Sequence, residues 1–288
     1  MYIFICENSI DGIFTSIYEA WASHLGHKNI KLISEEPDNY ELFCEYIHVK
    51  TDLEKSAKVS NTVLSRCGED VWSDICTAIM ANEFFSKKNK SSYSYFDITK
   101  ADAVYRVLLY AFSMQKPEQI MNCLGNPYVM YVFELCRHTT NEAHHLLGFL
   151  RFNELENRIL FSRIHPSNYV LPILADHFCD RLSTENFIIY DEIRDLAVLH
   201  KKSDSSSLSS GFKSQTFTFS SANKNFLIMD ASSINQEIIR TYSDDELEYQ
   251  KLWCGFFDSI AIESRKNTKL QNQNIPKRFQ KDALEFQK

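Results

Sequence analysis

The sequence predicts an α+β protein, and three observations lead to this prediction. Residues 51–145 have apolar side chains at helical spacing. Residues 146–230 follow the order hairpin, helix, hairpin, which is typical of an antiparallel sheet with a helix beside it. A capped helix and a basic tail follow over 231–288. With 288 residues, 44% of them hydrophobic, the chain can bury one large core or two modest ones.

Residues 1–50 are predicted to form a separate N-terminal segment with the order strand, helix, strand, strand. The opening YIFIC is a short apolar run that is typical of a buried strand. IFTSIYEAW comes after Asp11-Gly12, and its apolar residues are three and four apart, which predicts a helix. NIKLI and CEYIHVK are two further short strands, separated by a proline-containing loop.

The helical region, 51–145, contains the amphipathic stretches DLEKSAKVSNTVLSRC, VWSDICTAIMANEFF and ADAVYRVLLYAFSM. A further helix is expected to begin at Pro127, since Asn126 is a good N-cap and proline suits the first helical position. Thr139 and Glu142 have capping-box spacing. This spacing predicts a separate short helix that carries His144 and His145 and ends at a glycine.

The region 146–230 supplies the predicted sheet. FLRFNELENRILFSRI alternates around Glu156-Asn157, which predicts a hairpin. LPILADHFCDRL is a helix with proline near its start, and NFIIYDEIRDLAVLHK is a second hairpin. Residues 201–215 are polar and serine-rich, so we expect a mobile loop. TFTFSS and NFLIMD are then expected to resume as strands.

The region 231–288 joins a helix capped by Ser243 to a basic tail. The helix has one apolar stripe, which is predicted to be core. Its members are Leu252, Trp253, Phe256, Phe257 and Ile260. From residue 262 to the end there are seven cations and three anions, a net charge of +4 on a chain whose formal net charge is −7. Polyanion binding needs local positive charge, so this segment is where a nucleic acid is expected to bind. Cations at a solvated helix end are the plainer alternative.

Several classes of protein are excluded by absent patterns. No apolar run is long enough for a transmembrane helix, and the first residues lack signal-peptide features, so a cytoplasmic protein without membrane contact is expected. The eight cysteines have no metal-site or iron–sulfur spacing, and most are expected to be buried thiols. No glycine-rich phosphate loop is present. The chain is therefore expected to hold no metal and no cofactor of its own.

Two shorter motifs carry candidate site residues. Arg151 lies between Leu150 and Phe152 and is expected on the opposite sheet face, where it could hold a phosphate or stack on a base. His177 and Arg181 are four apart and share a helix face. Near a second histidine, His144 or His145, they could form a phosphate clamp with an acid–base pair, and Asp191 and Arg194 on the following hairpin could join this site. In each case an ordinary solvent-facing side chain is the alternative.

These segments together resemble one bacterial family. EAHHLLGFLRF, HPSNYVLPILADHFCDRL, FIIYDEIRDLAVLH and LWCGFFDSIAIESRKNTKLQNQNIPKRF carry the resemblance, and the C-terminal block is its most specific part. The family is one of DNA-metabolism or DNA-repair proteins, with a domain of unknown function, that accompany a radical SAM partner. In some relatives a similar domain is joined to a uracil-DNA-glycosylase-like domain.

The resemblance implies DNA or another nucleic acid and a radical SAM protein as partners, with the iron–sulfur cluster and S-adenosylmethionine held by the partner. Two departures stand out. The turn after the first strand is ENSIDG where the family has Tyr-Asp-Gly, and Phe279-Gln280 stands where it tends to Tyr-Trp. The family's motif residues, carried over to this chain, are Glu142, His144, Gly148, Arg151, Phe152, His177, Arg181, Asp191, Arg265, Asn267, Gln271, Pro276, Lys277 and Arg278.

Three functional hypotheses follow. In the first, the chain positions nucleic acid in DNA repair or modification beside the radical SAM enzyme. Its phosphate and nucleic-acid contacts would be Arg151, Arg181, Arg265, Lys266, Asn267, Lys269, Gln271, Lys277 and Arg278. In the second, the chain is itself a base-excising or phosphodiester-cleaving enzyme. Its catalytic residues would be His144, His177, Glu142 and Asp191. In the third, it is a non-catalytic interaction subunit whose basic tail binds an acidic partner.

Overall fold

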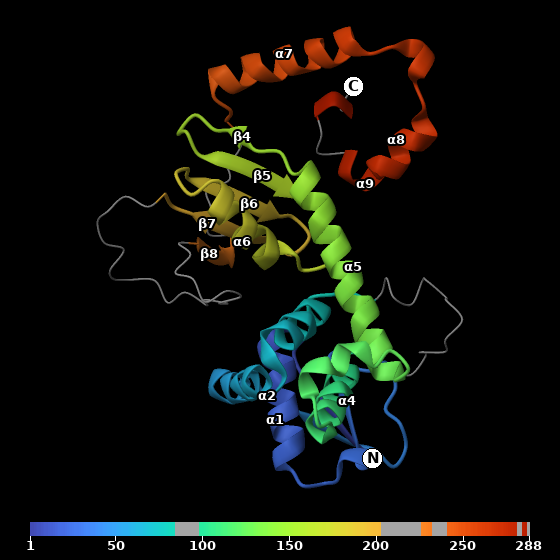
Figure 1. Cartoon of the computed structure of the whole chain (residues 1–288). Coiled ribbons are helices and arrows are strands. Elements are labelled where there is room, and N and C mark those ends of the chain that lie inside the picture. The colour runs from blue at the N-terminus through green and yellow to red at the C-terminus, as the bar shows by residue number, and fades with distance from the viewer. Residues whose placement is uncertain (84–97, 203–225, 232–240, 281–283, 287–288) are drawn as a thin grey trace. The chain divides into compact units, whose positions relative to one another are not determined.

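The protein is an α+β molecule of two compact units, residues 1–141 and 142–288 (Figure 1). The computed structural model describes residues 1–83, 98–202, 226–231, 241–280 and 284–286. In this part of the chain no helix combines the length and the apolar composition that a membrane span requires. The predicted fold class, with a helical middle region and a C-terminal helix, is confirmed.

The first unit contains a small parallel sheet. Its strands are β1 (Tyr2–Ile5), β2 (Ile30–Ile33) and β3 (Glu45–His48), in the order β2-β1-β3. Ile5 pairs with Ile33 on one side and with His48 on the other. The three strands predicted for residues 1–50 are therefore present. β1 is the central strand because its residues are the most apolar of the three and are buried between the other two.

The first two helices of the first unit begin with side-chain caps. The Ser9 hydroxyl accepts a hydrogen bond from the Gly12 N–H at 3.0 Å and starts α1 (Ile10–Ala22). Asp52 caps α2 (Leu53–Ile79) in the same way, and Gly68, with φ of 86°, divides α2 into two helical parts. Gly12 allows a close approach of chain segments, since a Cβ there would lie 2.4 Å from the Glu7 carbonyl oxygen.

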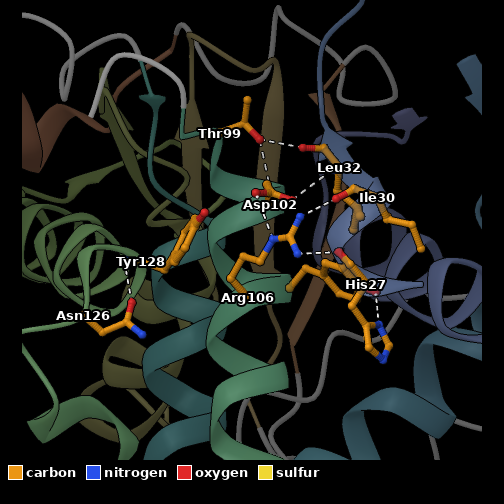
Figure 2. Close-up of polar contacts among 9 residues, drawn as sticks. His27, Ile30, Leu32, Thr99, Asp102, Arg106, Asn126 and Tyr128 are labelled. Carbon is orange, nitrogen blue, oxygen red and sulfur yellow. Dashed lines mark hydrogen bonds and ion pairs between the residues drawn. The ribbon is translucent and has the colours of Figure 1, made fainter. Parts of the chain in front are cut away.

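A polar network attaches α4 (Lys100–Ser113) to β2 and to the short turn η1 (His27–Asn29) (Figure 2). The Thr99 hydroxyl donates to the Leu32 carbonyl at 2.6 Å, and Asp102 accepts from the Leu32 N–H at 3.3 Å. Arg106 donates to the carbonyl of His27 in η1, to the carbonyl of Ile30 in β2 and to Asp102. β2 is an edge strand, and these side-chain hydrogen bonds take the place of the backbone hydrogen bonds that a further strand would form. The turn η2 (Pro117–Asn122) follows.

Helix α5 (Pro127–Phe149) is continuous, so the prediction of a separate short helix from Thr139 is wrong. The predicted start is confirmed: Asn126 Oδ1 accepts from the Tyr128 N–H at 3.0 Å (Figure 2). The Thr139 hydroxyl donates to the Leu135 carbonyl at 3.1 Å, which keeps it inside the helix. Glu142 likewise binds groups far along the chain and caps nothing. Without a breaking residue before it, the capping-box pattern has no helix end to satisfy.

The second unit contains a five-stranded sheet in the order β4-β5-β6-β7-β8. Both predicted hairpins are present, as β4–β5 and β6–β7, and β8 is antiparallel to β7. β5 and β6 are parallel, because α6 (Leu171–Arg181) connects them as a crossover helix. The strands are β4 (Asn153–Glu154), β5 (Leu160–Ile164), β6 (Phe187–Asp191), β7 (Leu196–His200) and β8 (Phe226–Asp230). The predicted strand TFTFSS and most of the serine-rich loop lie outside the described residues.

The main core of the second unit lies between one face of this sheet and the helices α5 and α6. Leu146 and Leu150 from α5 and its end pack with Leu174 and Phe178 of α6 and with Ile189 of β6. A smaller cluster around Leu155 and Ile188 covers the other face. The core therefore holds the end of α5 against α6.

The C-terminal region contains α7 (Asp244–Ile260), η5 (Glu263–Arg265), α8 (Thr268–Asn274), α9 (Lys277–Gln280) and η6 (Leu284–Phe286). Ser243 caps α7 as predicted, accepting from the Glu246 N–H at 3.1 Å.

The prediction that the apolar stripe of α7 is core is wrong. Leu252, Phe256 and Ile260 are 66%, 54% and 57% exposed. The sequence shows an amphipathic pattern but not which face meets the body. In the structure, polar side chains hold the helix to β4: Glu246 accepts from the Glu154 N–H at 3.1 Å, and Gln250 donates to Asn153 at 3.5 Å.

Candidate nucleic-acid interface

Glu142 is buried near the middle of a set of hydrogen-bond donors. Its Oε1 accepts from the Ser167 N–H at 3.0 Å and from Arg278 Nη1 at 2.9 Å. Its Oε2 accepts from both the backbone N–H and the side-chain amide of Asn168, each at 2.7 Å. The side chain is 1% exposed. A buried carboxylate with four donors is fully satisfied, so Glu142 fixes the geometry of the groups around it.

The segment that Glu142 holds, His165–Tyr169, connects β5 to α6 and is called the HPSNY segment below. Arg194 secures it from the β6–β7 hairpin by donating to the Ser167 carbonyl at 2.7 Å and to the Pro166 carbonyl at 3.2 Å. Asp191 in turn accepts from Arg194 Nη1 at 3.1 Å and from the Ile193 N–H at 3.0 Å. Three sequence-predicted residues, Glu142, Asp191 and Arg278, thus meet around one loop.

Burial shapes the ionisation of this network. Desolvation raises the pKa of Asp191 above its usual value, although the Arg194 guanidinium and the hydrogen bonds act in the opposite direction. Burial also raises the pKa of Tyr169 to about 12, with a further contribution from the Asp191 charge. The network is therefore a structural one with costly buried charge, held by good hydrogen bonding.

The basic tail is anchored at α9. Phe279 is 5% exposed, and its ring centroid lies 5.5 Å from that of Phe149 and 5.7 Å from that of His145. The Arg278 guanidinium lies over the Phe279 ring at 4.5 Å while it pairs with Glu142. Gln280 donates to Asn272 at 3.0 Å and to the Ile275 carbonyl at 2.7 Å, which ties α9 to α8. Since Phe279 is core, its ring is not presented to a base.

Four predicted phosphate ligands of this tail are exposed and have no ion-pair partner among the described residues. They are Arg265, Lys266, Lys269 and Lys277. Arg278 differs from them, because its guanidinium is held by Glu142. The Asn267 side chain caps α8 by accepting from the Leu270 N–H at 3.0 Å, and Gln271 is half-buried on the same helix. The two amides therefore lie among the cations in the sequence, and the Asn267 side chain is already used to cap α8.

Arg151 is exposed but does not lie on a strand, so that part of the prediction is wrong. It follows the end of α5, and its Nη1 donates to the carbonyls of Gly148 at 3.0 Å and Leu150 at 3.2 Å. A cation favours this position through the helix dipole. Phe149, two residues before Arg151 in the chain, contacts Phe279 of the anchored α9.

The predicted histidines His144 and His177 are not hydrogen-bonded to the buried carboxylates in the part of the chain that the structure describes. His144 is exposed on α5, and His177 and Arg181 are exposed on α6, four residues apart as predicted. The His177 ring contacts the Phe178 ring edge-on at 5.2 Å. No hydrogen bond joins His144 to His177, Glu142 or Asp191 in the described residues. In those same residues, no group of three or more His, Cys, Asp or Glu side chains is arranged to hold a metal ion.

Sequence reasoning did not find the HPSNY segment as the centre of the network. Its donors include the backbone N–H groups of Ser167 and Asn168. Nearly every residue has a backbone N–H, so the sequence does not indicate which of them will bind a distant carboxylate. The sequence predicts Arg194 only as a further member of the site around His177 and Arg181. The one available signal was a polar run between a strand and a helix, which requires partners for its backbone groups.

Comparison with known proteins gives a family for the chain and little beyond it. No curated protein matches. One similar solved chain is described as a member of the s1p family of ribosomal proteins, DHH domain; it has 13% identity over 69% of this chain and 73% of its own, with a TM-score of 0.27. That score is too low to bear on the fold. A family model, the domain of unknown function DUF4130, matches residues 99–285, from the cap of α4 to η6. The chain therefore belongs to the DUF4130 family.

Proposed function

We propose that this chain binds nucleic acid through its anchored basic segment, residues 265–278 with Arg151, and positions it in DNA repair or modification. The observation that supports the proposal is a set of exposed cations that form no ion pair within the described part of the chain, on a segment whose far end is fixed to the core. A partner enzyme supplies the chemistry; in the family that the sequence resembles this is a radical SAM protein.

The anchor is important because it reduces the entropy lost on binding. Phe279 is buried, Arg278 pairs with Glu142, and Gln280 holds α9 to α8. Lys269 on α8 and Lys277 on α9 are thus carried by linked elements rather than by a free tail. A preorganised pair of cations neutralises phosphates at a lower ordering cost than a mobile tail would.

The geometry favours binding over catalysis by this chain. The predicted acid–base site needs an imidazole and a carboxylate that lie within hydrogen-bond reach of each other and have open positions. Glu142 already accepts four hydrogen bonds, and Asp191 is completely buried and bonded to Arg194. The exposed histidines have no hydrogen bond to either carboxylate. Of the four residues predicted to be catalytic, Glu142 and Asp191 therefore stabilise the HPSNY segment, and His144 and His177 are exposed to solvent.

Fluorescence anisotropy with labelled single-stranded and double-stranded DNA and with RNA tests the proposal, using the full chain. We expect binding at low salt that weakens as salt rises. Lys269→Gln with Lys277→Gln should weaken binding roughly tenfold, since two phosphate contacts are removed. Lys28→Gln with Lys116→Gln is the matched control, because it removes the same charge from exposed positions of the first unit.

Two results would count against the proposal. One is the absence of salt-sensitive binding to any of the nucleic acids. The other is equal weakening by the tail variant and the control, which would mean that only the net charge of the chain is sensed. A difference in affinity between DNA and RNA would identify which class of nucleic acid the chain prefers.

A further inference from the structure

The outer face of α7 is an exposed apolar stripe. Tyr249, Leu252, Phe256 and Ile260 are 69%, 66%, 54% and 57% exposed, and their spacing of three or four residues puts them on one side of the helix. Glu246 and Gln250 hold α7 to β4 from a neighbouring side, so the stripe is not needed for that attachment. Neighbouring apolar side chains that are exposed together on a folded protein mark an interaction site.

The charges around the stripe identify the partner. The first turn of α7 is acidic, with Asp244, Asp245 and Glu246, and the segment just after the helix is basic, with Arg265 and Lys266. The order along the chain is therefore acid, apolar, base. A second copy of this same arm, running antiparallel, would place its basic end beside the acidic end of the first copy. The helix dipoles of the pair would also be antiparallel, which is favourable.

The register of the residues agrees with this arrangement. Leu252 and Phe256 are symmetric about Cys254. Tyr249 and Ile260 are symmetric about the point between Cys254 and Gly255, half a residue further along the helix. Half a residue is only about 0.75 Å along a helix, so one twofold axis near Cys254 brings apolar side chains against apolar side chains. Arg265 and Lys266 follow the end of α7, and the antiparallel arrangement puts them toward the acidic first turn of the other copy.

We propose that the chain forms a twofold-symmetric homodimer through antiparallel pairing of α7. Isologous pairing of one self-complementary patch is the commonest form of protein assembly. Leu252 of each copy packs against Phe256 of the other, and Asp244 and Asp245 face the second copy's Arg265 and Lys266. The dimer does not depend on the proposed nucleic-acid function. It assigns Arg265 and Lys266 to the interface, which leaves Lys269, Lys277 and Arg151 for phosphates.

Size-exclusion chromatography with light scattering, at up to about 100 μM protein, gives the first test, since small interfaces reach micromolar affinity. We expect the wild type to approach twice the 33.6 kDa of the chain as its concentration rises. Leu252→Gln with Phe256→Gln should give the single-chain mass at all concentrations. Both positions are exposed, so folding is retained, and circular dichroism verifies it.

A charge exchange tests the antiparallel register. Asp244→Lys with Asp245→Lys, and separately Arg265→Glu with Lys266→Glu, should each weaken the dimer at least tenfold. A mixture of the two variants should restore it, because both ends of the mixed dimer again pair opposite charges. A wild type that stays monomeric overturns the dimer and means that another protein or another part of the chain covers the stripe. A dimer that survives the Leu252/Phe256 change, or a mixture that is not restored, overturns the interface.

Discussion

Replacing Glu142 with alanine tests whether the HPSNY segment is held as the structure shows. The change removes the acceptor of four hydrogen bonds, so the N–H groups of the half-buried Ser167 and the buried Asn168 lose the carboxylate that accepts from them. Each unsatisfied buried group costs about 1–3 kcal/mol. Arg278 adds less, because its side chain is 43% exposed and regains water. We expect Glu142→Ala to lower the free energy of unfolding of the second unit by about 3–5 kcal/mol.

Urea unfolding followed by fluorescence measures this loss. Trp253 lies in the second unit and Trp21 and Trp72 lie in the first, so a variant with Trp253 as the sole tryptophan reports on the unit in question. Asn141→Ala, at the neighbouring exposed position of α5, is the control and should change stability by less than about 0.5 kcal/mol. A loss below about 1 kcal/mol for Glu142→Ala would refute the account of this network.

Three further changes follow from the structure. Burial raises the pKa of Asp191, so the folded protein binds this proton more tightly than the unfolded chain does. The free energy of unfolding of the wild type, measured relative to that of Asp191→Asn, should therefore fall as pH rises from the usual aspartate pKa through the raised one. A stability difference that is constant or rises with pH would contradict this. Burial raises the pKa of Cys6 to about 11, so at pH 8 roughly one Cys6 thiol in a thousand is ionised. If alkylation at pH 8 is followed by mass spectrometry, Cys6 should react much more slowly than the half-exposed Cys44. Gly12→Ala puts a Cβ 2.4 Å from the Glu7 oxygen and should cost the first unit about 1–3 kcal/mol in thermal unfolding, whereas Gly125→Ala, with open space around it, should cost much less.

Local patterns predicted the elements of this fold well. The caps at Asn126 and Ser243 and the hairpin of β6 and β7 depend on residues close together in the chain, and all three are present. The α+β class follows from the order of these elements. The parallel pairing of β5 and β6 follows from the helix between them, although the sequence alone suggested a wholly antiparallel sheet.

Partners distant in sequence set the limits of prediction. Glu142 has capping-box spacing from Thr139, yet its acceptors are used by Ser167, Asn168 and Arg278, the last of them 136 residues away. Similarly, the stripe of α7 has the period of a core helix but lies outside the core, because Glu246 decides which side meets β4. The period of the apolar residues shows that one face of a helix is apolar, but only tertiary contacts determine whether that face points to the core or to solvent.

The salt dependence of nucleic-acid affinity tests the central proposal most directly. The logarithm of the association constant, plotted against the logarithm of the salt concentration, has a slope of about −0.7 to −0.9 for each phosphate neutralised. We expect Lys269→Gln with Lys277→Gln to make this slope shallower by about 1.4–1.8, and the Lys28/Lys116 control to leave it unchanged. An unchanged slope in the tail variant, or no measurable binding by the wild type, would contradict the account.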